Sequence, residues 1–593
     1  MRKKLLMGAA AAALALAVSA APVGPGSSGQ ALFAALCAEG QGQSPWQVRL
    51  ASMLSMADAY AQTLPGDMNA PPPLVAGLGN AHLPISTTVP LTQEYFDQGV
   101  RYLHAFNHAE AIRAFRHAQR LDPNCAMCFW GEAFAYGPNI NAPMPASDND
   151  AAYAAVRRAN ELRGGATPIE QAFIEALQTR YARTAPENRA ALDAAFADAM
   201  GRAADRFPDN DLIQILAAEA AMDTQPWDYW QAGGREPKGR AGDAIRRVET
   251  VLARSPDNSG AIHLYIHLAE ASTDPWRSEA AAERLARTAP QAGHLVHMPG
   301  HIYYRVGRFR DSIRVNIEAV EADERYIASA DPSPMYRYGY YPHNVHFVLT
   351  SAAMGGDART ALEYADKLDE AVPIEMAQAV VMAQPVAAAS WFARARFANP
   401  QSVLAAPQPP AGVDYVTGAW RYARGEALVR AGRIAEARIE AESLQALINS
   451  GDFTAINGNG VPAQDILGIY RRVLIARAHM AEQNYPAAIA ELRAAAEAQT
   501  RVPYTEPPYI YYPIRRTLGA AYLLNDQPAV AEMEFLQTLI DSPNDAYAYW
   551  GLSQARRMRG DRSGANAARQ MFNAAFLGQR IRAKLAKQLR KSA

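Results

Sequence analysis

The chain has few cysteines and almost no net charge. Three cysteines in 593 residues cannot form the disulfide framework of a small secreted scaffold. The 58 lysines and arginines balance 59 aspartates and glutamates, so the formal net charge is −1. This balance excludes the basic surplus of a nucleic-acid-binding protein and a polycationic membrane tail. With 49 % hydrophobic and 20 % charged residues, the composition is that of a folded protein, not a disordered one.

Long apolar runs are also scarce. The longest, Leu5–Val18, follows the positive segment Arg2–Lys4 and precedes Val18–Ala20, whose small residues are typical of a cleavage site. We therefore predict a signal peptide over residues 1–20 and a periplasmic or secreted protein. An uncleaved membrane anchor is the alternative. We expect no membrane span after cleavage, because no later apolar run reaches about 18 residues.

The common catalytic motifs are missing, and a repeat of about 34 residues is present instead. There is no Walker loop, GxSxG elbow, HExxH helix or dinucleotide fingerprint. Small residues, aromatics and prolines recur at the spacing of tetratricopeptide (TPR) helix pairs, first at Tyr95, Gly99, Tyr102, Ala111, Phe115, Ala118 and Pro123. We predict an all-α, TPR-type helix-turn-helix solenoid, a right-handed superhelix, over residues 93–593. A Pro/Gly-rich arm over residues 21–92 precedes it.

Two insertions interrupt the repeat. They are Pro226–Gly239 and Ile327–Tyr341, and each is rich in tryptophan or tyrosine. Insertions in solenoids usually form loops on one face, often the binding face, so we interpret both as candidate lids. Simple connector loops are the alternative.

The histidines are few but concentrated. Of the twelve, nine lie three or four residues from another: His104, His108, His263, His267, His294, His297, His301, His343 and His346. This spacing places neighbouring imidazoles on one face of a helix, as two metal ligands from one helix require. We interpret the first pair, His104 and His108, as structural.

The other seven fall on the first helices of three consecutive repeats, at positions that face the concave groove in TPR proteins. We predict a transition-metal site for zinc or copper with the ligands His263, His267, Glu270, His294, His297, His301, His343 and His346. These residues are more numerous than the ligands of one ion. Either two ions bind, or some of the residues orient ligands or act as acid or base. Glu270 and His301 are the catalytic candidates. A groove that binds an acidic or aromatic ligand without metal is the alternative.

Further residues are predicted to contact a ligand in the groove. They are Glu219, Asp223, Tyr303, Tyr340, Tyr341, Asn344, Glu506 and Arg515. The tyrosines belong to two clusters beside prolines, and core packing is the alternative role for such aromatics.

Cys125 and Cys128 form a CxxC motif at the start of a predicted helix. In an oxidising compartment we predict a local disulfide between them, with copper(I) capture as the alternative. Cys37 is then left unpaired.

Several segments resemble a group of exported bacterial TPR proteins and, more distantly, the eukaryotic tetratricopeptide repeat protein 38 group. They are CAMCFWGEAFAYGPNIN, IHLYIHLAE, GHLVHMPGHIYYRVGR, YYPHNVHF and EPPYIYYPIRRTLG. The resemblance extends from Thr92 to the C-terminus and implies the fold but no reaction. TPR proteins in general are interaction scaffolds, which implies a protein, peptide or small-molecule partner in the groove.

Three functions are compatible with these features. The first is an exported solenoid whose histidine-lined groove binds a transition metal together with a ligand or partner. The second is a metal-dependent enzyme with its active site in the groove. The third is a metal-free scaffold for an extended peptide. Nucleic acid is not an expected partner.

Overall fold

The computed structural model describes residues 71–330 and 332–578. Within these ranges the chain consists of helices and connecting turns, with no β-strand. The predicted signal peptide, the arm as far as residue 70 and Cys37 lie outside the described residues. None of the helices described combines the length and the apolar character that crossing a bilayer requires.

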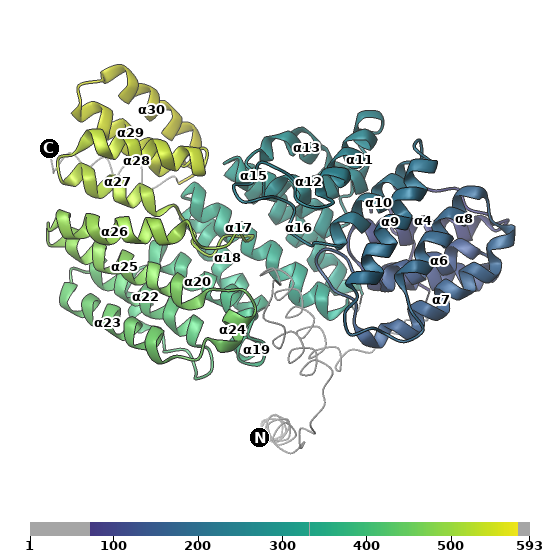
Figure 1. Cartoon of the computed structure of the whole chain (residues 1–593). Helices are drawn as coiled ribbons and strands as arrows, with labels where there is room; N and C mark the ends of the chain where they lie inside the picture. Colours follow the sequence, from purple (N-terminus) through teal and green to yellow (C-terminus); the bar gives the residue numbers. More distant parts are fainter. Residues whose placement is uncertain (1–70, 331, 579–593) are drawn as a thin grey trace, which may run out of the picture. The chain divides into compact units, whose positions relative to one another are not determined.

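Successive helices lie side by side as antiparallel pairs (Figure 1). The first pairs are α4 (Pro90–His104) with α5 (His108–Leu121), α6 (Ala126–Tyr136) with α7 (Asn149–Leu162), α8 (Pro168–Leu177) with α9 (Ala190–Arg206), and α10 (Asp211–Asp223) with α11 (Ala241–Arg254). The next are α12 (Ser259–Glu270) with α13 (Glu279–Thr288), α14 (Gly293–His297) and α15 (Pro299–Arg305) with α16 (Phe309–Ser329), and α17 (Tyr341–Gly355) with α18 (Ala358–Ala371).

The C-terminal half continues in the same way. Its helices are α20 (Ala383–Phe397), α22 (Asp414–Arg430) with α23 (Ile434–Ser450), α25 (Ala463–Ala481) with α26 (Tyr485–Gln499), α27 (Ile514–Leu524) with α28 (Pro528–Asp541), and α29 (Ala546–Met558) with α30 (Arg562–Ala575). Short helices connect some of them: α19 (Ile374–Ala379), α21 (Pro400–Ala405) and α24 (Thr454–Gly458). This pairing confirms the predicted all-α, TPR-type fold.

The small and aromatic residues of the repeat fit together as the sequence predicts. The ring of Phe115 fills the space between two glycines, and a Cβ would lie 2.5 Å from it at Gly99 and 2.4 Å from it at Gly131. Phe535 is enclosed in the same way by Gly519 and Gly551 near the C-terminus. Glycine is therefore needed wherever a buried ring separates two closely packed helices.

A pair of glycine variants tests this packing. Gly551→Ala is expected to lower the free energy of unfolding by about 1–3 kcal/mol, because the new Cβ would lie 2.1 Å from the Phe535 ring. The melting temperature should fall accordingly. The matched control is Gly468→Ala in α25, where a Cβ meets nothing within 4 Å. This change should stabilise the helix by up to about 1 kcal/mol. Equal effects in thermal melts would contradict the packing described.

The two insertions are packed segments. In the first, Trp227 Nε1 donates to the carbonyl of Ile140 at 2.9 Å and Trp230 Nε1 donates to that of Leu268 at 2.8 Å. The second is only partly a loop, because α16 extends to Ser329 and a π-helical turn over Tyr336–Tyr340 leads directly into α17. The prediction of a second loop insertion is corrected accordingly.

The described end of the arm, residues 71–89, lies along the first repeats. Asn80 Nδ2 donates to the carbonyl of Asp257 at 2.8 Å, and Asn80 Oδ1 accepts from the Ser259 amide at 3.1 Å. Leu78 and Leu83 are buried. This part of the arm therefore covers α12, the helix that carries the first two predicted metal ligands.

Cys125 and Cys128 are joined by a disulfide at the start of α6. Cys125 is the N-cap residue of this helix, and its sulfur accepts from the Cys128 amide. In this oxidised form the two sulfurs are not thiolate ligands for copper(I).

Candidate metal centre

Six of the predicted histidine ligands converge from three consecutive repeats, on α12, α14, α15 and α17. They are His263, His267, His294, His297, His301 and His343. The first five are no more than 3 % exposed and the last is half-buried. The sequence predicts a groove-lining position for these rings; in the structure other segments cover them, and four of them line a cavity. Trp227, for example, packs edge-on against His267 with ring centroids 4.9 Å apart.

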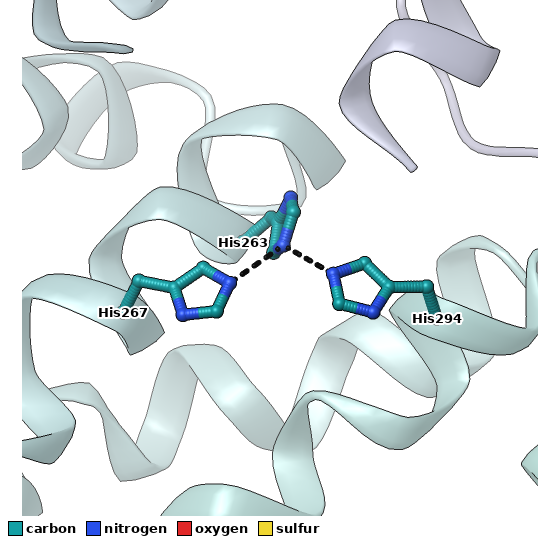
Figure 2. A group of neighbouring side chains, drawn as sticks. All are labelled: His263, His267 and His294. Atoms are coloured by element: carbon teal, nitrogen blue, oxygen red, sulfur yellow. Dashed lines mark hydrogen bonds between the residues drawn. The ribbon is translucent and has the colours of Figure 1, made fainter. Parts of the chain in front are cut away.

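The first histidine triad consists of His263, His267 and His294 (Figure 2). Nε2 of His263 lies 3.1 Å from Nε2 of His267 and 3.0 Å from Nε2 of His294. Three imidazole nitrogens therefore meet at one point inside the protein. Such a set provides three of the four ligands of a tetrahedral zinc site.

For two of these rings, the hydrogen-bond partner of the ring indicates whether Nε2 carries the lone pair. His267 Nδ1 is 2.8 Å from Glu270 Oε1, so its N–H donates to the carboxyl group and its Nε2 carries a lone pair. The ring of His263 is hydrogen-bonded to the backbone of His104, which leaves a lone pair on its Nε2 as well. Two lone pairs 3.1 Å apart repel each other unless a proton or a cation lies between them. The carboxylate–histidine contact is also the usual outer-shell arrangement of a metal ligand.

The second histidine triad consists of His297, His301 and His343. Nε2 of His297 lies 2.6 Å from Nε2 of His301, and the ring centroid of His343 lies 4.7 Å from that of His297. Asn316 on α16 orients His297, because Asn316 Oδ1 is 2.5 Å from His297 Nδ1 while its Nδ2 donates to the Ser312 carbonyl. Sequence analysis missed Asn316, whose only signal is a polar residue one turn after Ser312.

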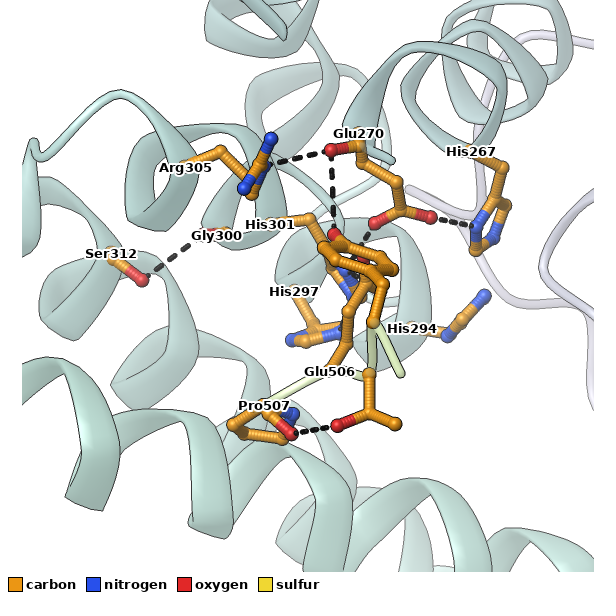
Figure 3. Close-up of polar contacts among 12 residues, drawn as sticks. His267, Glu270, His294, His297, Gly300, His301, Arg305, Ser312, Glu506 and Pro507 are labelled. Carbon is orange, nitrogen blue, oxygen red and sulfur yellow. Dashed lines mark hydrogen bonds and ion pairs between the residues drawn. The ribbon is translucent and has the colours of Figure 1, made fainter. Parts of the chain in front are cut away.

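Two carboxyl groups, the carboxylate pair Glu270 and Glu506, meet at Nδ1 of His301 (Figure 3). Glu270 Oε2 lies 2.5 Å from this nitrogen, and Glu506 Oε2 forms a second ion pair with it. These three atoms are buried and have no partner of hydrogen-bond geometry among the described residues. Tyr504 donates to the other oxygen of Glu506, and Arg305 Nε donates to the Glu270 carbonyl at 2.8 Å. The two carboxyl groups therefore place negative charge at the outer nitrogen of His301.

Burial sets the charge state of the rings. It lowers the pKa of His263 to about 3, and burial together with neighbouring imidazoles lowers that of the other histidines in both triads, except His301, well below the ordinary value. These rings are neutral at pH 7 and present lone pairs. Burial alone would also lower the pKa of His301, but Glu506 and Glu270 outweigh it and raise this pKa to about 10. Burial and the neighbouring Glu506 raise the pKa of Glu270.

Two cavities adjoin the centre, and His301 and Glu506 line both. The smaller cavity, of about 150 Å³, is also lined by His267, His294, His343, His346 and Tyr340. The larger cavity, of about 360 Å³, is lined by Tyr304, Arg305, Tyr504 and Arg515 among others. The centre is thus buried, but ligand-sized spaces reach it from two sides.

Several predicted site residues lie elsewhere. His346 belongs to neither triad, and its Nε2 lies 3.1 Å from the Tyr511 hydroxyl. The prediction of groove contacts is corrected for five residues that line neither cavity: Glu219 and Asp223, buried beside Arg180; Tyr303, stacked on Arg308; Tyr341, bonded to Glu324; and Asn344, bonded to Asp323. Each has a protein partner that the sequence pattern does not reveal.

Comparisons with known proteins add no function. No family model matches the chain, and no curated protein matches it significantly. Among solved structures, the Cut9–Hcn1 complex of APC/C is 14 % identical (91 % of this chain and 82 % of that chain, TM-score 0.27). Yeast Tom70 is 10 % identical (82 % and 92 %, TM-score 0.27), and the human IFIT1 dimer with PPP-AAAA is 12 % identical (81 % and 94 %, TM-score 0.30). Because these TM-scores are below 0.5, the fold assignment depends on the helix pairs described above.

Proposed function

We propose that this chain is an exported TPR-type protein that binds two divalent transition-metal ions, one in each histidine triad. The observation that carries the proposal is the meeting of three Nε2 atoms in the first triad, with the other nitrogen of His267 held by Glu270. Zinc and copper(II) both accept imidazole ligands of this kind. Export is proposed from the predicted signal peptide over residues 1–20.

The chain's own residues would fix the geometry of both sites. Glu270 holds the outer nitrogen of His267, and Asn316 holds that of His297, so both Nε2 atoms are directed inward before an ion arrives. A bound ion would supply Lewis acidity to a ligand in the smaller cavity. At His301 the ion would replace the proton on Nε2, so we expect proton release on loading.

Elemental analysis of the purified protein tests the proposal. After dialysis against Zn²⁺ and removal of excess ion, wild-type protein should retain about two equivalents of zinc. His263→Ala/His267→Ala and His297→Ala/His301→Ala should each lose about one equivalent. His479→Ala in α25, a histidine outside both triads, is the matched control and should lose none. Wild-type protein without retained zinc would leave the metal-free scaffold as the better explanation. Double variants with full zinc content would show that the ions do not bind in the two histidine triads.

One observation favours a metal-dependent enzyme as the second candidate. Glu270, a predicted catalytic residue, is fully buried and lines neither cavity, whereas Glu506 lines both and contacts His301. In an enzyme, Glu506 is therefore the better placed of the two carboxyl groups to contact a substrate, although His301 outweighs burial, lowers its pKa to about 2 and so weakens it as a general base. A Co²⁺-loaded protein whose visible spectrum changes on addition of acetate has an open coordination position, as an enzyme needs. An unchanged spectrum favours a closed structural or storage site.

A further inference from the structure

We propose that the smaller cavity binds an apolar carboxylate, whose anionic end is held by the metal centre and whose hydrocarbon body fills the rest of the cavity. This inference depends on the proposed function, because the anion is bound through the metal. It adds a class of ligand: small monocarboxylates with an alkyl or aromatic body.

The position of the cavity supports the anionic end. Its polar side consists of His267 and His294 from the first triad, and His301 and His343 from the second. Rings of the two triads approach each other closely, with centroids 6.1 Å apart for His267 and His301. A single ligand in this cavity therefore lies beside both proposed ions, and a carboxylate offers two oxygens for them.

The opposite wall of the cavity is apolar. It is formed by side chains of the π-helical turn, α19, α20 and the segments before them, among them Tyr340, Val372, Met376, Met382, Pro385 and Val386. Methionine side chains have three rotatable bonds, so they adapt to ligand bodies of different shape. Most of the surface of this wall is apolar. It therefore suits a hydrocarbon body better than a sugar, whose hydroxyl groups need hydrogen-bond partners.

The charges around the cavity make the metal necessary. Among the described lining residues there is no lysine or arginine, and Glu506 is the one carboxylate. The one lining group that could offer a positive charge, His301, is already paired with Glu270 and Glu506, so without a metal ion an entering carboxylate would meet no free positive charge beside an existing negative one, which costs free energy. The larger cavity differs, because Arg305 and Arg515 line it and would attract anions with or without metal. Metal-dependent binding of an apolar anion is thus specific to the smaller cavity.

Calorimetric titration with acetate, butanoate and hexanoate tests the inference. Zinc-loaded protein should bind each longer acid about two- to fourfold more tightly per added methylene, as burial of the chain requires. Chelator-treated protein should bind none of them. Zinc content is measured on the same samples, so a failure to load zinc is seen directly and would remove both proposals. Loaded protein that binds acetate as tightly as hexanoate would overturn this inference and leave the metal sites standing.

Two variants locate the binding. Met382→Gln places an amide of similar length in the apolar wall and should abolish most of the gain per methylene without changing the zinc content. Thr500→Ala, in the larger cavity, is the matched control and should preserve the full series. A Met382→Gln protein with the wild-type chain-length dependence would place the hydrocarbon body elsewhere and refute the assignment.

Discussion

Glu270→Ala is expected to weaken zinc binding by the first histidine triad about 10- to 100-fold. The reason is that Glu270 Oε1 is the acceptor that holds the Nδ1–H of His267. Without it, His267 is free to adopt the other tautomer, in which Nε2 carries the hydrogen and cannot bind an ion. Glu270→Gln keeps an oxygen at this position and should restore most of the affinity. This rescue separates an orienting role from loss of a direct ligand.

The measurement is a competition titration of each purified variant against a zinc chelator, with circular dichroism as a check on folding. Glu506→Gln is the matched control, because Glu506 contacts His301 and has no contact with His267. It should change the affinity of the second triad and leave that of the first within about twofold. If alanine and glutamine at position 270 weakened the first triad equally, the orienting role of Glu270 would be wrong.

Asp223→Ala is expected to lower the free energy of unfolding by about 3–5 kcal/mol. Arg180 is fully buried, and its Nη2 donates to Asp223 Oδ2 at 2.8 Å and to the Pro138 carbonyl at 2.7 Å. Burial raises the pKa of Asp223 in spite of Arg180, but the guanidinium keeps its charge, so the alanine variant would leave a buried cation without its closest hydrogen-bond acceptor. Burial raises the pKa of the nearby Glu219 to about 7, so this carboxyl only partly replaces the lost charge at neutral pH.

Urea denaturation in the presence of chelator measures this effect without a contribution from metal. The double variant Arg180→Met/Asp223→Leu removes both charges and should recover most of the lost stability. Glu318→Ala breaks the exposed ion pair with Arg314 and should change stability by no more than about 0.5 kcal/mol. An Asp223→Ala protein as stable as the Glu318→Ala control would mean that the buried pair does not hold these helices together.

The repeat made most of the fold predictable. Positions such as Gly99 and Phe115 recur because each helix pair solves the same packing problem, and the structure uses them for the predicted close contacts. The insertion before α17 was harder to predict. Its tyrosines are compatible with either a loop or a helical turn, and packing against Asp323, to which Tyr336 donates at 2.6 Å, favours the turn.

The histidines of the candidate site were predictable from helix spacing and from the repeat. Spacing places His263 beside His267, and the repeat brings His294 and His301 near them. Helix spacing did not place His346 correctly. Residues three apart on a helix differ by about 60° in direction, and the ring of His346 on α17 points toward Tyr511. Nor does periodicity show that Glu506 would reach His301, since this contact joins repeats that are distant in sequence.

The contact between Tyr504 and the Glu270 carbonyl joins residues 234 positions apart. A growing polypeptide presents α12 to α17 long before the loop that carries Tyr504 and Glu506 exists. The imidazoles are thus without their second carboxylate until the chain has been extended to residue 506. The centre is completed only when the segment with Tyr504 and Glu506 has been made, so its final geometry depends on a part of the chain that is synthesised late.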